Sequence, residues 1–100
     1  KESFGTPDDV ERYKVSCAIY NSKMPNGGSV IDHVLYMIEL IEKLGKLGCP
    51  LHEQLGKDAI LNSLPSSYLD FFDHYRMNKP AVNYHGLLGL LQTFEKDHQL

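Results

Sequence analysis

The stretch that decides the fold is PNGGSVIDHVLYMIELIEKLGKLG, residues 25–48. Two adjacent glycines, Gly27 and Gly28, follow a proline and an asparagine, and such a cluster is typical of a turn. Glycine tolerates a positive φ, so the chain can turn sharply here. Ser29 then occupies the position of a helix N-cap, and Asp32 follows three residues later, as in a capping box. We therefore expect a helix that begins at about residue 30.

The helix expected over residues 30–47 has a broad apolar face. At about 100° per residue, one face collects six apolar side chains: Val30, Val34, Met37, Ile38, Ile41 and Leu44. Leu35, Tyr36 and Leu40 flank this face and widen it. A helix with one neighbour needs only a single apolar stripe, so we expect this one to be central and to contact several others. Gly48 suits a C-terminal cap.

Proline and glycine divide the rest of the chain into four further predicted helices. They are expected at about residues 7–22, 51–64, 66–77 and 83–98, and the first begins with the start signal Thr6-Pro7-Asp8-Asp9. The first of these helices has apolar side chains at helical spacing at Val10, Tyr13, Cys17 and Tyr20. No strand-like alternation and no internal repeat is visible. The prediction is an all-α, compact bundle of about five short helices forming one domain over residues 1–100.

Two groups of apolar residues have different expected roles. The predicted core consists of Val30, Val34, Met37, Ile38, Ile41, Leu64, Tyr68, Phe72, Leu87 and Leu91. The third helix carries a second apolar stripe, which is either core or a surface kept for a partner. With two tyrosines of the first helix, this stripe supplies the candidate self-association residues: Leu51, Leu55, Ala59, Tyr13 and Tyr20.

Charge and composition argue against several kinds of partner. The net charge is −3, and Lys43, Lys46 and Lys57 alternate with acidic residues, so we expect no direct nucleic-acid binding. No apolar run approaches the roughly 20 residues that cross a bilayer, and we expect no membrane partner. Two cysteines, Cys17 and Cys49, form neither a disulfide framework nor a zinc set. We expect reduced thiols packed as small apolar groups and a cytoplasmic location.

The sequence offers no convincing catalytic constellation. His52-Glu53 resembles the start of a zinc-protease helix, but position 56 is glycine where the second histidine would stand. The five histidines have no ligand-like spacing, and no nucleophile, base and oxyanion-binding set can be assembled. We expect no enzyme activity, no small-molecule substrate, and no catalytic, cofactor-binding or metal-binding residue. A small enzyme or regulator that uses the histidines is the weakest alternative.

Several short motifs follow one another in a fixed order along most of the chain. The run S-V-x-x-H-V-x-x-M at residues 29–37 is followed by Leu47-Gly48 and Pro50-Leu51. The run I-L-x-S-L-P-x-S-Y-x-x-F covers residues 60–71, and Y-x-M-N at 75–78 and L-x-x-L-L-x-x-x-E at 87–95 come after it. Together they resemble the gag polypeptide of copia-type LTR retrotransposons. This family is abundant in plants.

The resemblance implies a function. Such gag proteins are similar to retroviral capsid proteins, and this chain would correspond to the capsid C-terminal domain, which helps to assemble a shell. The glycine turn and apolar helix would occupy the position of the retroviral major homology region, although its hallmark Gln and Glu are missing. We therefore expect self-association, as a homodimer or a higher assembly. The alternative is a domesticated gag-derived host protein that acts as a protein–protein interaction adaptor.

Overall fold

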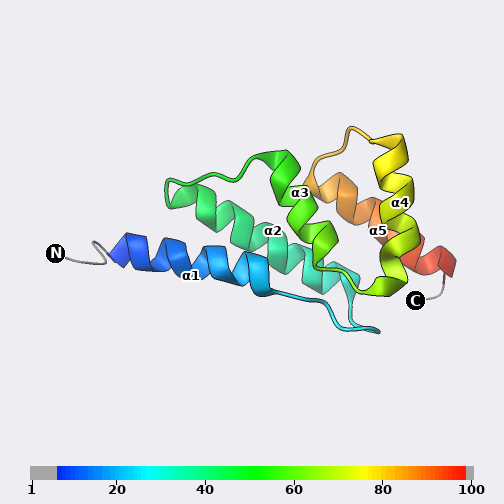
Figure 1. Ribbon diagram of the computed structural model, residues 1–100, viewed down its shortest axis with the longest axis horizontal. Coiled ribbons are helices and arrows are strands. Elements are labelled where there is room, and N and C mark those ends of the chain that lie inside the picture. Colours follow the sequence, from blue (N-terminus) through cyan, green and yellow to red (C-terminus); the bar gives the residue numbers. More distant parts are fainter. Residues whose placement is uncertain (1–6, 99–100) are drawn as a thin grey trace.

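The computed structural model describes residues 7–98 and is all-α over this range, with no strand. Figure 1 shows the elements in chain order, with a short 3₁₀ helix η1 before α4. Their bounds are α1 Pro7–Asn21, α2 Val30–Lys46, α3 Glu53–Asn62, η1 Ser66–Tyr68, α4 Leu69–Asn78 and α5 Tyr84–His98. The predicted fold class is confirmed, and the predicted helix ends agree to within two residues when η1 and α4 together are compared with the fourth predicted helix. The expected N-cap Thr6 lies outside the described residues.

The turn before α2 is built as the sequence indicates. Gly27 has a φ of 81°, and the Gly28 N–H donates to the Pro25 carbonyl oxygen at 3.0 Å, which closes the turn. A Cβ on Gly28 would lie 3.1 Å from that same oxygen, so a side chain there would be crowded. The Asp32 N–H donates to Ser29 Oγ at 3.2 Å, which satisfies one of the free amides at the helix start. At the other end, Gly48 has a φ of 90°.

Helix α2 is the centre of the molecule. It packs against α1, α3 and α5, and all six residues of its predicted apolar face are buried. Figure 1 shows α2 running back alongside α1 after the 22–29 linker. Lys43 Nζ lies 2.7 Å from Glu11 Oε2 and ties the two helices together at the surface. The hydrogen bond and charge of Lys43 lower the pKa of the Glu11 carboxyl.

Eight of the ten predicted core residues are buried, and two are not. Leu64 is half-buried and packs against the core from outside. Phe72 is 37% exposed, so the expectation that it belongs to the core is wrong. Its neighbour Phe71 takes that place, with its ring centroid 5.5 Å from that of Phe94 on α5. Consecutive residues of a helix point about 100° apart, so burying Phe71 against α5 turns Phe72 outward.

Helix α1 buries the face opposite to the one that its spacing suggested. Val15 and Ile19 are 4% and 2% exposed, whereas Tyr13 and Tyr20 are each 66% exposed. Val10 is exposed too, and Cys17 is half-buried. The thiol of Cys49 is exposed, which corrects the expectation that both cysteines pack as small apolar groups.

Ser63, directly after α3, joins three segments of the chain. Its hydroxyl donates to the Ile60 carbonyl at 2.6 Å, and its own carbonyl accepts from the Met24 N–H at 2.8 Å. Because the Ser63 hydrogen is used in this way, His33 Nε2 donates to Ser63 Oγ across 2.7 Å. Met24, in the linker before α2, is only 5% exposed. The α1–α2 linker is therefore attached to the core rather than free in solvent.

Candidate interaction surface

Four of the five predicted self-association residues lie around one groove between α1 and α3. This α1–α3 groove has a volume of about 260 Å³, and Tyr20, Leu51, Leu55 and Ala59 all line it. Tyr13 lies outside the groove, two helical turns before Tyr20 on the outer side of α1. We call these five residues the α1–α3 face.

The α1–α3 face divides into exposed and half-buried members. Tyr13, Tyr20 and Leu55 are 66%, 66% and 56% exposed. Leu51 and Ala59 are half-buried and pack against the core, so they also support the fold. The exposed members are large, apolar or aromatic, and are tolerated at the surface of an isolated domain without stabilising it. Of these three, Tyr20 and Leu55 line the same groove, and exposed apolar side chains that lie together are a feature of interaction sites.

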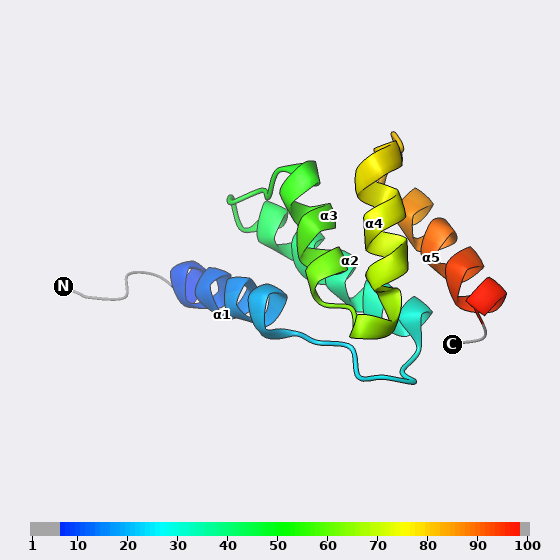
Figure 2. The ribbon, with the colours of Figure 1, turned by 45° about the vertical axis from the view of Figure 1, so that its right-hand side comes forward.

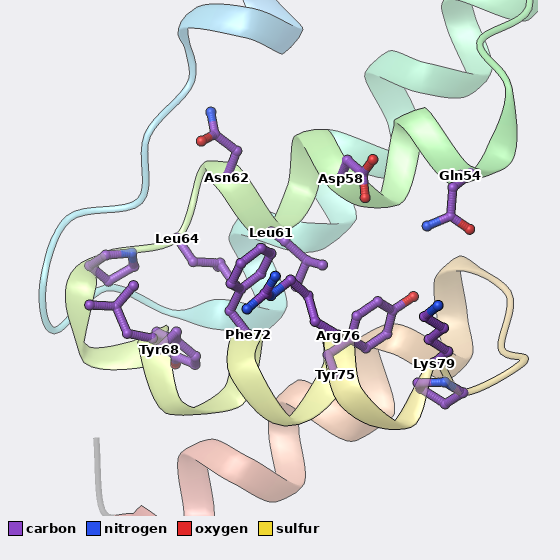
Figure 3. A pocket seen from close by; sticks show the side chains of 13 residues that line it. Gln54, Asp58, Leu61, Asn62, Leu64, Tyr68, Phe72, Tyr75, Arg76 and Lys79 are labelled. Atoms are coloured by element: carbon purple, nitrogen blue, oxygen red, sulfur yellow. The ribbon is translucent and has the colours of Figure 1, made fainter.

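A second and larger hollow lies between α3 and α4. This α3–α4 groove has a volume of about 930 Å³. Figure 3 shows Leu61 of α3 facing Phe72, Tyr75 and Arg76 of α4 across it. Sequence reasoning placed Phe72 in the core and so missed the groove. The available signal was four aromatic residues at positions 68, 71, 72 and 75, more than one contact with a single helix can bury.

The rim of the α3–α4 groove carries more positive than negative charge. Arg76 and Lys79 stand on the α4 side and Asp58 on the α3 side. The Arg76 guanidinium lies 5.5 Å from the centre of the Phe72 ring and 4.0 Å from the Asp73 carboxylate at the surface. Lys79 ends α4 in the left-handed conformation, with a φ of 44°. Cations at the end of a helix also interact favourably with its dipole.

The α4–α5 loop and the first residue of α5 pack closely against α3. Lys57 is 6% exposed, and its ammonium donates to the Val82 carbonyl oxygen at 2.8 Å. Tyr84 covers Gly56 so closely that a Cβ at that position would collide with the phenol ring. Sequence reasoning did not predict either contact, since both depend on where the α4–α5 loop and the start of α5 cross α3.

Other polar residues serve the fold. His52 Nδ1 accepts from the Gln54 N–H at 3.1 Å and caps α3, while the His98 ring stacks on Phe94. Burial raises the pKa of the Tyr68 hydroxyl, and the nearby Glu95 carboxylate raises it further. Among residues 7–98, no group of three or more His, Cys, Asp or Glu side chains is placed to hold a metal ion. No helix in the same range has the length and apolar character needed to cross a membrane.

The described residues form an all-α fold that carries two largely apolar grooves. Comparison with protein families gives a match to the gag-polypeptide of LTR copia-type over residues 1–99. The chain therefore belongs to this family, as its motif order suggested. Comparison with curated proteins and with solved structures gave no match.

Proposed function

We propose that this chain is a structural self-association module of a retrotransposon gag protein. Membership of the gag family supports a role in the retrotransposon's gag polypeptide. The observation that carries self-association is the α1–α3 face, where Tyr13, Tyr20 and Leu55 are all more than half exposed. Burying these side chains against sister molecules removes apolar surface from water, at about 25 cal/mol per Å².

Each contact of this kind is weak, and assembly depends on repetition. Three large side chains and their neighbours make an interface smaller than the roughly 1,200 Å² of buried surface found in stable complexes. Many such contacts in one shell act together, because each bound copy holds the next contact at high effective concentration. The proposed module is therefore monomeric when dilute and associates as its concentration rises.

Light scattering after gel filtration tests this proposal. The mean mass of the wild-type chain should rise above the 11.4 kDa monomer with increasing protein concentration. Leu55→Asp should keep the mass at the monomer value across the same range, because a buried carboxylate opposes the contact. Its circular dichroism spectrum should match the wild type, since Leu55 is 56% exposed.

A matched control and two contrary outcomes complete the design. Met77→Asp places the same charge on another exposed helical residue, 81% exposed and outside both grooves, and should leave self-association intact. A wild-type chain that stays monomeric at every concentration contradicts the proposal. Loss of helicity in Leu55→Asp would assign Leu55 to the core and remove it from the interface.

The second candidate is a domesticated gag-derived host protein that acts as an adaptor. The α3–α4 groove favours it, because about 930 Å³ of largely apolar hollow is enough to receive a short helix from another protein. An adaptor remains monomeric at concentrations where a capsid-type module associates. The mass measurement above therefore separates the two candidates.

A further inference from the structure

We infer that two copies of this chain pair through antiparallel α1 helices about a twofold axis, so that Tyr13 of each copy enters the α1–α3 groove of the other. The inference rests on the proposed self-association and names how the α1–α3 face meets itself. Every residue of that face has a place in the contact. Tyr13 is the inserted side chain, and the groove that receives it is lined by Tyr20, Leu51, Leu55 and Ala59.

Tyr13 and Tyr20 lie on the same side of α1. Seven residues turn a helix to within about 20° of two full turns and advance it about 10.5 Å. Both side chains are 66% exposed, whereas Val15 and Ile19 on the other side are buried. Tyr13 lines neither groove of its own chain, and Tyr20 stands at the edge of one. A second, antiparallel α1 therefore brings Tyr13 opposite Tyr20 twice, once at each end of the contact.

The α1–α3 groove has the size and lining to receive one aromatic side chain. Its volume of about 260 Å³ is below the roughly 300–1,000 Å³ of sites that hold small molecules. Tyr20 and Leu55 form exposed, apolar edges on its two sides. A tyrosine ring between them buries all three exposed members of the α1–α3 face at once, and aromatic pairs add to the gain from burial.

The centre of the contact allows the two helices to approach. The midpoint between Tyr13 and Tyr20 falls between Ser16 and Cys17, and both of these side chains are small and half-buried. Small residues at a crossing point leave the backbones close together, so the longer tyrosines at the two ends can reach across.

The shape of the molecule leaves the groove open to the N-terminal half of another α1. The Met24 N–H donates to the Ser63 carbonyl and the Lys23 ammonium to the Asn62 carbonyl, which joins the C-terminal ends of α1 and α3. Figure 2 shows the two helices diverging from there, with the first turns of α1 at one end of the molecule. The start of α1 in one copy can therefore lie in the angle between α1 and α3 of the other.

The charged residues of α1 fall on two flanks of this contact. Around the helix, Asp9 stands about 40° from Tyr13 and Arg12 about 100°, both in the direction of Ile19. Ile19 lines the groove, so this flank is the one next to α3. Lys14 stands about 100° from Tyr13 in the other direction, on the flank away from α3. A twofold axis between antiparallel helices places equal flanks on the same side, so Asp9 and Arg12 of one copy face α3 of the other.

The groove carries the opposite charges in the matching order. Lys23 and Asp58 both line it, and Lys23 is at its outer end beside Asn62. Counted from the midpoint of α1, Asp9 and Lys23 are at nearly equal distances, so Asp9 of one copy meets Lys23 of the other. Arg12, one turn further in, then meets Asp58. Asp9 already interacts within its own chain, and a carboxylate has room for a further donor.

These ion pairs favour one orientation of the two helices. Exposed pairs add little affinity, but they select the register and the direction of a contact. A parallel pair would place Asp9 against Asp9 and Lys14 near Lys14 along the whole helix. Antiparallel helices also oppose their dipoles favourably. Charge and shape therefore agree on a second copy of this chain as the occupant of the groove.

The proposed axis places the two copies of Cys17 next to each other. With helix axes about 9 Å apart, the two Cys17 Cα atoms lie about 6 Å from each other. Disulfides join Cα atoms that are roughly 4.4–6.8 Å apart, so this contact can be trapped by oxidation. A twofold contact also uses the same surface twice and closes at two copies.

Oxidative cross-linking of two single-cysteine chains tests the geometry. Cys49→Ser leaves Cys17 as the one thiol, and Cys17→Ser leaves the exposed Cys49. Under a mild oxidant, the chain with Cys17 should form the disulfide-linked dimer about tenfold faster, although its thiol is the less exposed. Light scattering should show a mass that rises with concentration to twice the 11.4 kDa of the monomer and stops there.

Substitutions in the chain that keeps Cys17 link the cross-link to the groove. Tyr13→Asp and Leu55→Asp should each lower its cross-linking rate about tenfold or more, because a twofold contact contains every residue twice. Leu90→Asp, on exposed α5 surface outside both grooves, is the matched control and should leave the rate unchanged. Circular dichroism checks that all three chains keep their helicity, and if Leu55→Asp does not, Tyr13→Asp decides.

The contrary outcomes are distinct from failure of the proposed function. If the wild-type mass rises but Cys17 cross-links no faster than Cys49, with the oxidant and with a short bis-maleimide that needs no disulfide geometry, the inference is overturned and self-association stands. A mass that continues beyond two copies, or a Tyr13→Asp chain that cross-links at the full rate, overturns it as well. A wild-type chain that stays monomeric contradicts the proposed function itself.

Discussion

Helices α1 and α2 pack against each other, yet they use their apolar residues in opposite ways. All six residues of the broad face of α2 are buried among three neighbouring helices. The apolar residues of α1 divide between two opposed sides, and only the side with Val15 and Ile19 is covered. Helical spacing alone therefore does not say which side of a helix is inside. The number of neighbours decides, and α1 lies at the edge with one main neighbour.

The largest change in stability is expected when one residue of each helix is truncated, Met37→Ala in α2 and Tyr13→Ala in α1. Met37 is 0% exposed, so its loss leaves a cavity and should lower the free energy of unfolding by about 2–5 kcal/mol. Tyr13 is 66% exposed, and its truncation should leave the urea midpoint of the dilute chain unchanged. Urea titration followed by circular dichroism measures both. A large loss of stability in Tyr13→Ala would place the exposed side of α1 in the core and contradict the difference between the two helices.

A smaller effect is expected at the start of α2. Ser29→Ala removes the hydroxyl that accepts from the Asp32 N–H and should cost about 1 kcal/mol, within a usual range of 0.5–2. Ser29→Asp keeps an acceptor at the cap and should restore most of the stability. Equal losses in both variants would show that the hydrogen-bond acceptor at the cap is not the source of the lost stability. Thermal unfolding of the three proteins at one concentration makes the comparison.

The smallest expected effect concerns His33 and pH. Burial lowers the pKa of His33 below its ordinary 6.5, so the unfolded chain takes up this proton more readily than the folded one. The contribution of neutral His33 is therefore fully present above about pH 6.5 and is lost as the pH falls below that value. Urea titrations at pH 7.5 and 5.5 should show a greater loss of stability for the wild type than for His33→Gln. The same loss of stability in both proteins would show that His33 does not contribute to the pH dependence of unfolding.

The fold could be predicted from the sequence at positions where the residue type restricts the backbone conformation or the side of the helix that is buried. The turn at Gly27, the cap at Ser29 and the two prolines at 50 and 65 mark helix ends by backbone geometry, which depends little on the rest of the chain. The broad face of α2 was equally clear, because its six apolar residues have no competing side. These features gave the helix bounds and the central position of α2.

Choices between neighbouring residues could not be predicted in the same way. Phe71 and Phe72 are identical in chemistry, and only the position of Phe94 on α5 decides which one is buried. The burial of Lys57 likewise depends on a single carbonyl oxygen in the α4–α5 loop. Sequence reasoning named the residues of the α1–α3 face as candidates for self-association, whereas it did not predict the α3–α4 groove, because that groove follows from the outward position of Phe72.

The hydrogen bond from the Met24 N–H to the Ser63 carbonyl oxygen affects whether two molecules could exchange helix α1 by domain swapping. Domain swapping needs a hinge that opens, and short linkers between helices often supply one. Here the linker cannot straighten without withdrawing the Met24 side chain from the interior and breaking its bond to Ser63. Amide hydrogen exchange at Met24 should therefore be as slow as in the middle of α2. These two contacts hold helix α1 at a fixed angle to the rest of the fold.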